Sequence, residues 1–103
     1  MDKICFTEET GGTNCGDITV YALSTCAFCK KALKFLKENS VHFKYVYVDD
    51  LDPDLKDRIK QELRRKYDRE VGFPFLIIDD EKTIVGFKEG EYNEEILGRR
   101  KNS

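Results

Sequence analysis

The sequence has no large excess of charge, no long apolar run and no internal repeat. Lysine and arginine nearly balance aspartate and glutamate over the 103 residues, which leaves a formal net charge of −2. A chain with this balance has no overall positive field to attract nucleic acid, so we expect no nucleic-acid partner. No apolar run approaches the ~20 residues that a membrane-spanning helix needs, and we therefore expect no membrane association.

A secretory signal is also missing from the sequence. Residues 1–5 do not place a basic segment before an apolar one, which is the pattern of such a signal. Four cysteines in a chain of this kind fit a reducing compartment better than a secreted domain held together by disulfides. We therefore expect a cytoplasmic protein. The length indicates one domain with a modest core, and we expect a monomer.

The most informative stretch is Cys26-Ala27-Phe28-Cys29, which separates an apolar segment from an amphipathic one. Residues 17–23 are almost continuously apolar, as in a strand that is buried on both faces. The residues that follow the motif predict a helix over about residues 27–39. One face of that helix is apolar and consists of Cys29, Ala32, Leu33 and Leu36.

The position of the two cysteines at the start of a helix has a chemical consequence. A cysteine in the first helical turn faces unpaired backbone N–H groups and the positive end of the helix dipole. Both favour the thiolate, so we assign Cys26 as a nucleophile. Cys29, one turn further along, can attack a mixed disulfide formed at Cys26. The residues alone leave two other interpretations open, a pair of inert core thiols and part of a zinc site.

The rest of the pattern predicts an α/β fold. Residues 42–48 are rich in aromatic and β-branched side chains and form a second strand, so the helix between the two strands implies a parallel βαβ unit. Asp52 and Pro53 mark the start of a second helix. The remaining predicted elements are strands over residues 75–79 and 83–87 and a helix over residues 91–97. The predicted order is βαβαββα, with a four-stranded mixed sheet flanked by helices.

Residues 1–16 have the weakest pattern, and we expect them to form an appendage to a domain over residues 17–103. A short strand or hairpin is one alternative for this segment, and a loose tail is another. Cys5 and Cys15 lie within it. They can be bystander thiols, a second redox pair, or zinc ligands together with the CxxC pair. We favour bystanders, because acidic neighbours raise the pKa of a thiol.

The element order, the CxxC at the first strand–helix junction and Pro74 at the start of the third strand together resemble the thioredoxin superfamily. The resemblance covers about residues 17–97. Within that superfamily, the aromatic residue directly before the second cysteine, Phe28, makes the motif similar to that of the glutaredoxin branch. The resemblance implies a thioredoxin-like fold and thiol–disulfide exchange at Cys26 and Cys29, with no resident cofactor and with a disulfide-containing protein as substrate. The alternative function is a metal-binding cysteine module, which holds either zinc or an iron–sulfur cluster of the kind that some glutaredoxins, usually those with a single active-site cysteine, share between two chains.

The resemblance also implies a substrate groove beside the two cysteines. In the family the proline at the Pro74 position is cis and lies against the active-site disulfide. The backbone of the preceding residue, here Phe73, pairs with the extended chain of the substrate. Phe87 has two alternatives, a core position and a groove position. The other groove residues implied by the resemblance are Thr25, Ala27, Phe28 and Gly86.

Some positions depart from the glutaredoxin pattern, and they bear on the electron donor. Glutaredoxins usually carry Lys or Arg where this chain has Leu23, and a Gly-Gly pair where it has Gly86-Phe87. The Gly-Phe pair at this position is similar to the one in the small glutaredoxin-like redoxins, which reduce ribonucleotide reductase and are themselves reduced by thioredoxin reductase. We therefore expect a reductase of that type as the electron donor. Glutathione is left open as a partner.

Overall fold

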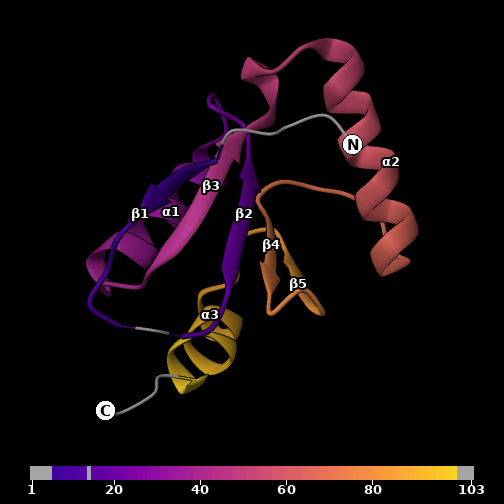
Figure 1. The fold of residues 1–103 in the computed structure, drawn as a ribbon. Coiled ribbons are helices and arrows are strands. Elements are labelled where there is room, and N and C mark those ends of the chain that lie inside the picture. Colours follow the sequence, from indigo (N-terminus) through magenta and orange to yellow (C-terminus); the bar gives the residue numbers. More distant parts are fainter. Residues whose placement is uncertain (1–5, 14, 100–103) are drawn as a thin grey trace.

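A five-stranded mixed sheet organises the chain, and Figure 1 shows its strands between the helices. The computed structural model describes residues 6–13 and 15–99. The strand order is β1-β3-β2-β4-β5, in which β2 and β3 are parallel and all other neighbours are antiparallel. The strands are β1 (Thr7–Glu9), β2 (Ile18–Ala22), β3 (Phe43–Tyr47), β4 (Phe75–Ile78) and β5 (Lys82–Val85).

Helices cover both faces of this sheet, and Figure 1 shows α1 and α2 on opposite sides of it. The helices are α1 (Ala27–Glu38), α2 (Pro53–Tyr67) and α3 (Glu89–Glu95), with short 3₁₀ turns η1 (Val48–Asp50) and η2 (Leu97–Arg99). The predicted α/β class and the βαβαββα order are therefore confirmed for the part of the chain that follows β1. None of the described helices is long and apolar enough to cross a membrane.

The sheet has one strand more than the four that the sequence predicted. The additional strand, β1, comes from the segment expected to be an appendage, and it pairs antiparallel with β3 at the edge of the sheet. Side-chain contacts support it: Glu8 Oε1 lies 3.0 Å from His42 Nε2, and Glu9 Oε1 forms an ion pair of 3.5 Å with Lys37 Nζ. Polar residues at a sheet edge carry little apolar alternation, so the sequence pattern did not reveal this strand.

Two apolar cores lie on the two faces of the sheet. Side chains alternate along a strand, so Val20 and Ala22 of β2 face one core while Tyr21 faces the other. The α1-side core also contains buried residues of α1 and α3, among them Leu36 and Tyr92. The α2-side core contains Ile59, Leu63, Val46, Val48, Phe75 and Ile77.

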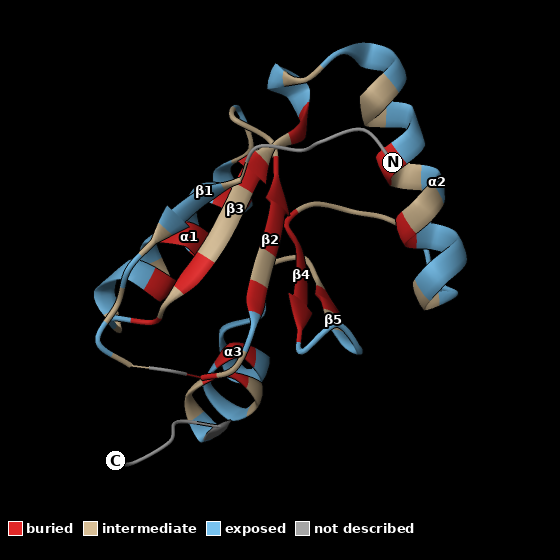
Figure 2. Ribbon diagram, in the orientation of Figure 1, coloured by how far each residue is buried: buried red, intermediate tan, exposed pale blue. Residues whose placement is uncertain are grey.

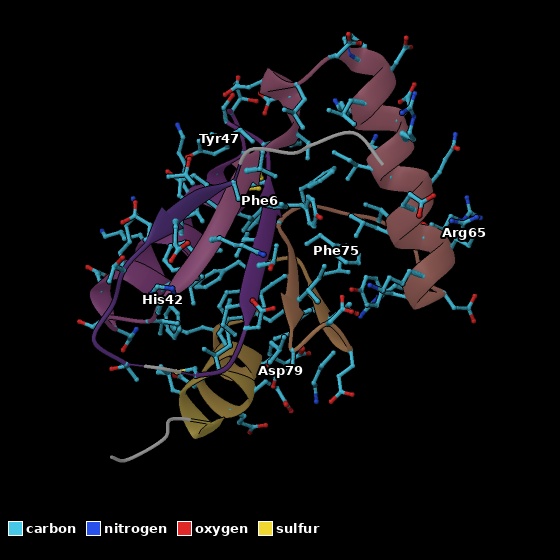
Figure 3. The ribbon with its side chains drawn as sticks, in the orientation of Figure 1. Phe6, His42, Tyr47, Arg65, Phe75 and Asp79 are labelled. Carbon is cyan, nitrogen blue, oxygen red and sulfur yellow. The ribbon has the colours of Figure 1, made fainter. Side chains whose placement is uncertain are left out.

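The central strands are the most buried part of the sheet. Every residue of β4 is buried, because its neighbours β2 and β5 pair with both edges and helices cover both faces. Figure 2 shows β2 and β4 mostly in the buried colour, whereas α2 is mostly exposed or intermediate. Phe75 of β4 points toward α2, as Figure 3 shows. The sheet therefore forms a rigid platform for the segments at the ends of its strands.

The elements near the carboxyl end of the chain have boundaries that differ by one or two residues from the predicted ones. Strand β5 ends at Val85, two residues earlier than expected, and α3 begins at Glu89 rather than at residue 91. The strand ends there because Gly86 has a φ of 82°, a left-handed conformation that other residues rarely adopt. Phe87 consequently lies in a connecting segment, outside the strand.

Candidate active site

Cys26 is the N-cap residue of α1, so it stands where β2 and its following turn meet the helix. Its backbone is extended, with φ −88° and ψ 121°. The backbone N–H of Cys29 donates to its Sγ at 3.3 Å, in the manner of an ordinary capping side chain. The turn before the helix is closed by a hydrogen bond of 3.2 Å from the Cys26 N–H to the Leu23 carbonyl. The helix start therefore holds the sulfur at its positive end.

Cys29 occupies the first turn of α1 and is fully buried against the sheet, in the α1-side core. Its Sγ accepts a hydrogen bond of 3.4 Å from the Leu23 N–H. Burial raises the pKa of Cys29 to about 12, because a thiolate would lose its hydration there, and the neighbouring charges of Cys26 and Asp49 add to the effect. Cys29 is therefore a thiol at neutral pH.

The pKa of Cys26 is shifted in the opposite direction. Partial burial opposes its ionisation, but hydrogen bonds from the Cys29 thiol and from the N–H groups of Cys29 and Phe28 outweigh that effect. The pKa of Cys26 therefore lies below the ordinary value of a thiol. The two sulfurs are in hydrogen-bonding contact, yet one favours the thiolate and the other favours the thiol.

A carboxylate from a distant part of the chain holds the turn before Cys26. Asp49 lies in η1, directly after β3, and its Oδ1 accepts a hydrogen bond of 2.9 Å from the Ser24 N–H. Its Oδ2 accepts a hydrogen bond from the Ser24 hydroxyl. These two bonds lower the pKa of Asp49, so the carboxylate stays charged. The sequence pattern did not reveal this residue, although parallel strands place the segments after β2 and β3 at the same sheet edge.

The segment before β4 contributes the two other main candidates. The peptide bond between Phe73 and Pro74 is cis, and Pro74 is buried while Phe73 is partly exposed. The Gly86 N–H donates to the Pro74 carbonyl at 2.9 Å, so Gly86 is tied to this segment. Phe73 and Cys26 both pack at the margin of the α1-side core. The structure thus assembles the CxxC, the proline segment and Gly86 around one end of the sheet.

The remaining candidate residues differ in their exposure. Thr25 and Ala27 are exposed on either side of Cys26, and Phe28 has 58% of its surface exposed. Lys31 lies with its Nζ 5.6 Å from the centre of the Phe28 ring. Phe87 instead packs inward, with ring centroids 5.9 Å from Phe35 and 5.1 Å from Tyr92.

The two other cysteines precede β2 in the chain. Cys5, with its expected bystander role, lies outside the described residues. Cys15 is buried in the α1-side core. Within residues 6–13 and 15–99, the structure has no group of three or more His, Cys, Asp or Glu side chains placed to hold a metal ion.

Comparisons with known proteins agree with this arrangement. A family model described as Glutaredoxin matches residues 18–83, a range that includes both cysteines of the motif and Pro74. The chain is 36% identical over 74 residues to an uncharacterised glutaredoxin-like 8.6 kDa protein in the rubredoxin operon of Clostridium pasteurianum. That match covers 72% of this chain and 89% of the relative.

Solved structures give the same result. The glutaredoxin from Methanosarcina mazei Go1 has 42% identity and a TM-score of 0.76, with 91% of this chain and 89% of that chain covered. Methanoredoxin from Methanosarcina acetivorans has 38% identity and a TM-score of 0.76, with 87% and 94% covered. The family match and the shared fold support thiol–disulfide oxidoreductase activity. The chain therefore belongs to the glutaredoxin family, within the thioredoxin superfamily.

Proposed function

We propose that this protein is a dithiol electron carrier that reduces disulfide bonds in other proteins. The observation that carries the proposal is the contrast between two thiols in contact. Cys26 is partly exposed and has a lowered pKa, whereas Cys29 is buried and has a raised pKa. Thiol–disulfide exchange needs a thiolate to attack first and a protected thiol to act second. The pair at the start of α1 meets both needs.

The reaction proceeds in two exchange steps. The Cys26 thiolate attacks one sulfur of the substrate disulfide, which breaks that bond, forms a mixed disulfide and releases the other substrate sulfur as a thiolate. Cys29 then loses its proton and attacks the Cys26 sulfur. The second step forms the Cys26–Cys29 disulfide and releases the second substrate thiol. Two electrons have moved to the substrate, and an external reductant must return two electrons to the protein.

The surroundings of the two cysteines support a polypeptide substrate. Phe28 offers an exposed apolar surface beside Cys26. The backbone of Phe73, held next to the buried Pro74, is the group we assign to pair with an extended substrate chain. Gly86 supports that segment through its bond to the Pro74 carbonyl. Thr25 and Ala27 are exposed next to Cys26 and complete the proposed contact surface.

We further propose that a flavoprotein of the thioredoxin reductase type, rather than glutathione, returns the electrons. A glutathione carboxylate needs cations and oriented N–H groups, and Leu23 supplies no cation at the position where glutaredoxins usually carry one. The test compares reduction of the oxidised protein by NADPH with such a reductase and by glutathione. Faster reduction by glutathione would contradict this choice of donor.

A trapping experiment tests the exchange mechanism itself. Cys29→Ser removes the resolving thiol and keeps the nucleophile, so incubation with a disulfide-containing protein should accumulate a mixed disulfide at Cys26. Mass spectrometry locates the linkage after proteolysis. Cys15→Ser is the matched control, because it removes a buried thiol that lies outside the CxxC, and it should accumulate no adduct. If a mixed disulfide instead accumulates at Cys29 in the Cys26→Ser variant, and none accumulates in Cys29→Ser, then Cys29 is the nucleophile and Cys26 the resolving thiol.

A further inference from the structure

A row of lysines continues from the nucleophile along α1. Lys30 and Lys34 follow Cys26 at intervals of four residues, and side chains with this spacing are neighbours on one helix face. Both lysines are exposed. The first turn of α1 contains no acidic residue. We call Lys30 and Lys34 the lysine row.

Within the described part of the chain, no carboxylate forms an ion pair with the lysine row. Other lysines do have such partners, among them Lys66 and Lys82, each 2.7 Å from a carboxylate oxygen. Asp49 belongs to the site but accepts its hydrogen bonds from Ser24. Positive charge is therefore left available beside Cys26 in a chain whose net charge is −2.

We propose that the lysine row selects protein substrates whose disulfide is flanked by aspartate or glutamate. The inference rests on the proposed function, because it names the class of protein disulfide that this site reduces. Complementary charge at the rim of a contact surface raises the rate of productive encounter and disfavours partners of like charge. Phe28 supplies an apolar contact that serves any substrate, whereas the lysine row supplies the discrimination.

The length of the row favours a polypeptide over a small anionic thiol. Lys34 is eight positions beyond Cys26, which corresponds to about 12 Å along the helix axis at the rise of an α-helix. An extended chain covers that span with about four residues. Carboxylates within a few residues of the substrate cysteine can therefore approach both lysines while the sulfur is attacked.

The test uses disulfide peptides that differ only in their flanking residues, which are Glu, Gln or Lys. For the unaltered protein we expect kcat/KM to be about fivefold or more higher for the Glu-flanked than for the Lys-flanked peptide, from two exposed charge pairs in water. The double variant Lys30→Gln, Lys34→Gln should bring this ratio close to one. Added salt should have the same effect in the unaltered protein, because it screens exposed charges.

The matched control removes the same amount of charge from α2. Arg64→Gln, Arg65→Gln alters two exposed cations near the end of that helix, and Figure 3 shows Arg65 pointing away from the rest of the molecule. This variant should keep the ratio of the unaltered protein. The ratio compares two peptides with one enzyme, so a change in the pKa of Cys26 caused by removing nearby lysines cancels.

The outcomes separate this inference from the proposed function. If the Gln-flanked peptide is reduced but the ratio is near one in the unaltered protein, the lysine row has no selective role. An unchanged ratio in the Lys30, Lys34 variant has the same meaning. A Gln-flanked peptide that is not reduced at all would overturn the proposed function instead. Glutathione disulfide is the remaining comparison. If it is reduced faster than the Glu-flanked peptide, and if the Lys30, Lys34 variant slows the reduction of both substrates equally, the lysine row binds small anions. That result would overturn the inference.

Discussion

The two long helices begin in opposite ways. Helix α2 follows the ordinary rules for a helix start: the Asp52 side chain accepts the Asp54 N–H at 3.0 Å, Pro53 occupies the first position, and Asp54 complements the dipole. Helix α1 has a cysteine as its N-cap and no acidic residue in its first turn. The exposed Lys30 and Lys31 lie close to this start, where cations are unfavourable, whereas Lys37 lies in the last turn.

The difference indicates what each helix start is used for. Helix α2 uses its free N–H groups for its own stability, and its end is held to the β4–β5 turn by hydrogen bonds from Lys66 and Tyr67 to Asp80. At the start of α1, the backbone N–H of Cys29 and the positive end of the helix dipole interact with the sulfur of Cys26. Local rules are commonly broken at functional sites and followed elsewhere. The comparison therefore supports the proposed chemical role for the start of α1 and indicates a structural role for the start of α2.

The largest expected effect breaks the chemistry of α1 without breaking its fold. Cys26→Ser replaces the cap by another good N-cap residue, so the helix start should be retained. A serine hydroxyl is not ionised near neutral pH, and disulfide reductase activity should fall to the uncatalysed background. Turnover of a protein disulfide and circular dichroism are measured together. Retained activity in a correctly folded variant would contradict the assignment of Cys26.

A second effect concerns the pH dependence of thiol alkylation. The pKa of Cys26 is lowered, whereas that of Cys29 is raised to about 12. Alkylation of Cys26 by iodoacetamide should therefore rise with pH and level off below the ordinary thiol pKa of about 8.5, while Cys29 should react slowly until the solution is strongly alkaline. Peptide mapping distinguishes the two sites. Faster labelling of Cys29 at neutral pH would exchange their roles.

A smaller effect sharpens the other half of the comparison. Asp52→Ala removes the N-cap of α2 and should lower the free energy of unfolding by about 1 kcal/mol. Turnover should remain that of the parent, because the start of α2 has no assigned role in the exchange steps. Urea denaturation and the reductase assay measure the two quantities. A large loss of activity at unchanged stability would place the start of α2 in the mechanism.

The smallest effect concerns a residue that packs against α1. Tyr92 of α3 is fully buried, and its hydroxyl has no hydrogen-bond partner among the described residues. Tyr92→Phe keeps the ring contacts with Phe35 and Phe87 and removes the unpaired group, so the protein should be as stable as the parent or more stable by up to about 1 kcal/mol. Thermal unfolding measures this change, and a clear destabilisation would indicate a partner for the hydroxyl.

Sequence periodicity was sufficient for most of the architecture. The apolar run of β2, the amphipathic face of α1 and the cap of α2 are local patterns, and each element lies where its pattern predicts it. Strand β1 was not predicted as part of the sheet, because Thr7–Glu9 is polar and is held by pairing with β3. The end of β5 depended on the backbone conformation of Gly86, which the apolar pattern around it does not encode.

Residue patterns alone predicted the candidate site only where its chemistry is local, whereas Phe73, Pro74 and Gly86 were expected from the family resemblance. Cys26 and Cys29 are three residues apart on one helix start, so their contact follows from helix geometry. The contact between Ser24 and Asp49 joins residues separated by 25 positions. It depends on the parallel pairing of β2 with β3, which brings the segments that follow them together. A single sequence does not show such a partner until the sheet topology is known.

In the proposed mechanism, the burial of Cys29 also determines the lifetime of the covalent complex with a substrate. Burial keeps Cys29 mostly protonated at neutral pH, so in the proposed mechanism release of the bound partner waits for deprotonation of Cys29. Burial is the largest cause of the raised pKa, whereas the smaller contributions from Cys26 require its free sulfur. The complex should therefore dissociate about tenfold faster for each unit increase in pH, until Cys29 ionises. Capture of a partner depends on Cys26, whereas its residence on the protein follows the proton concentration of the surroundings.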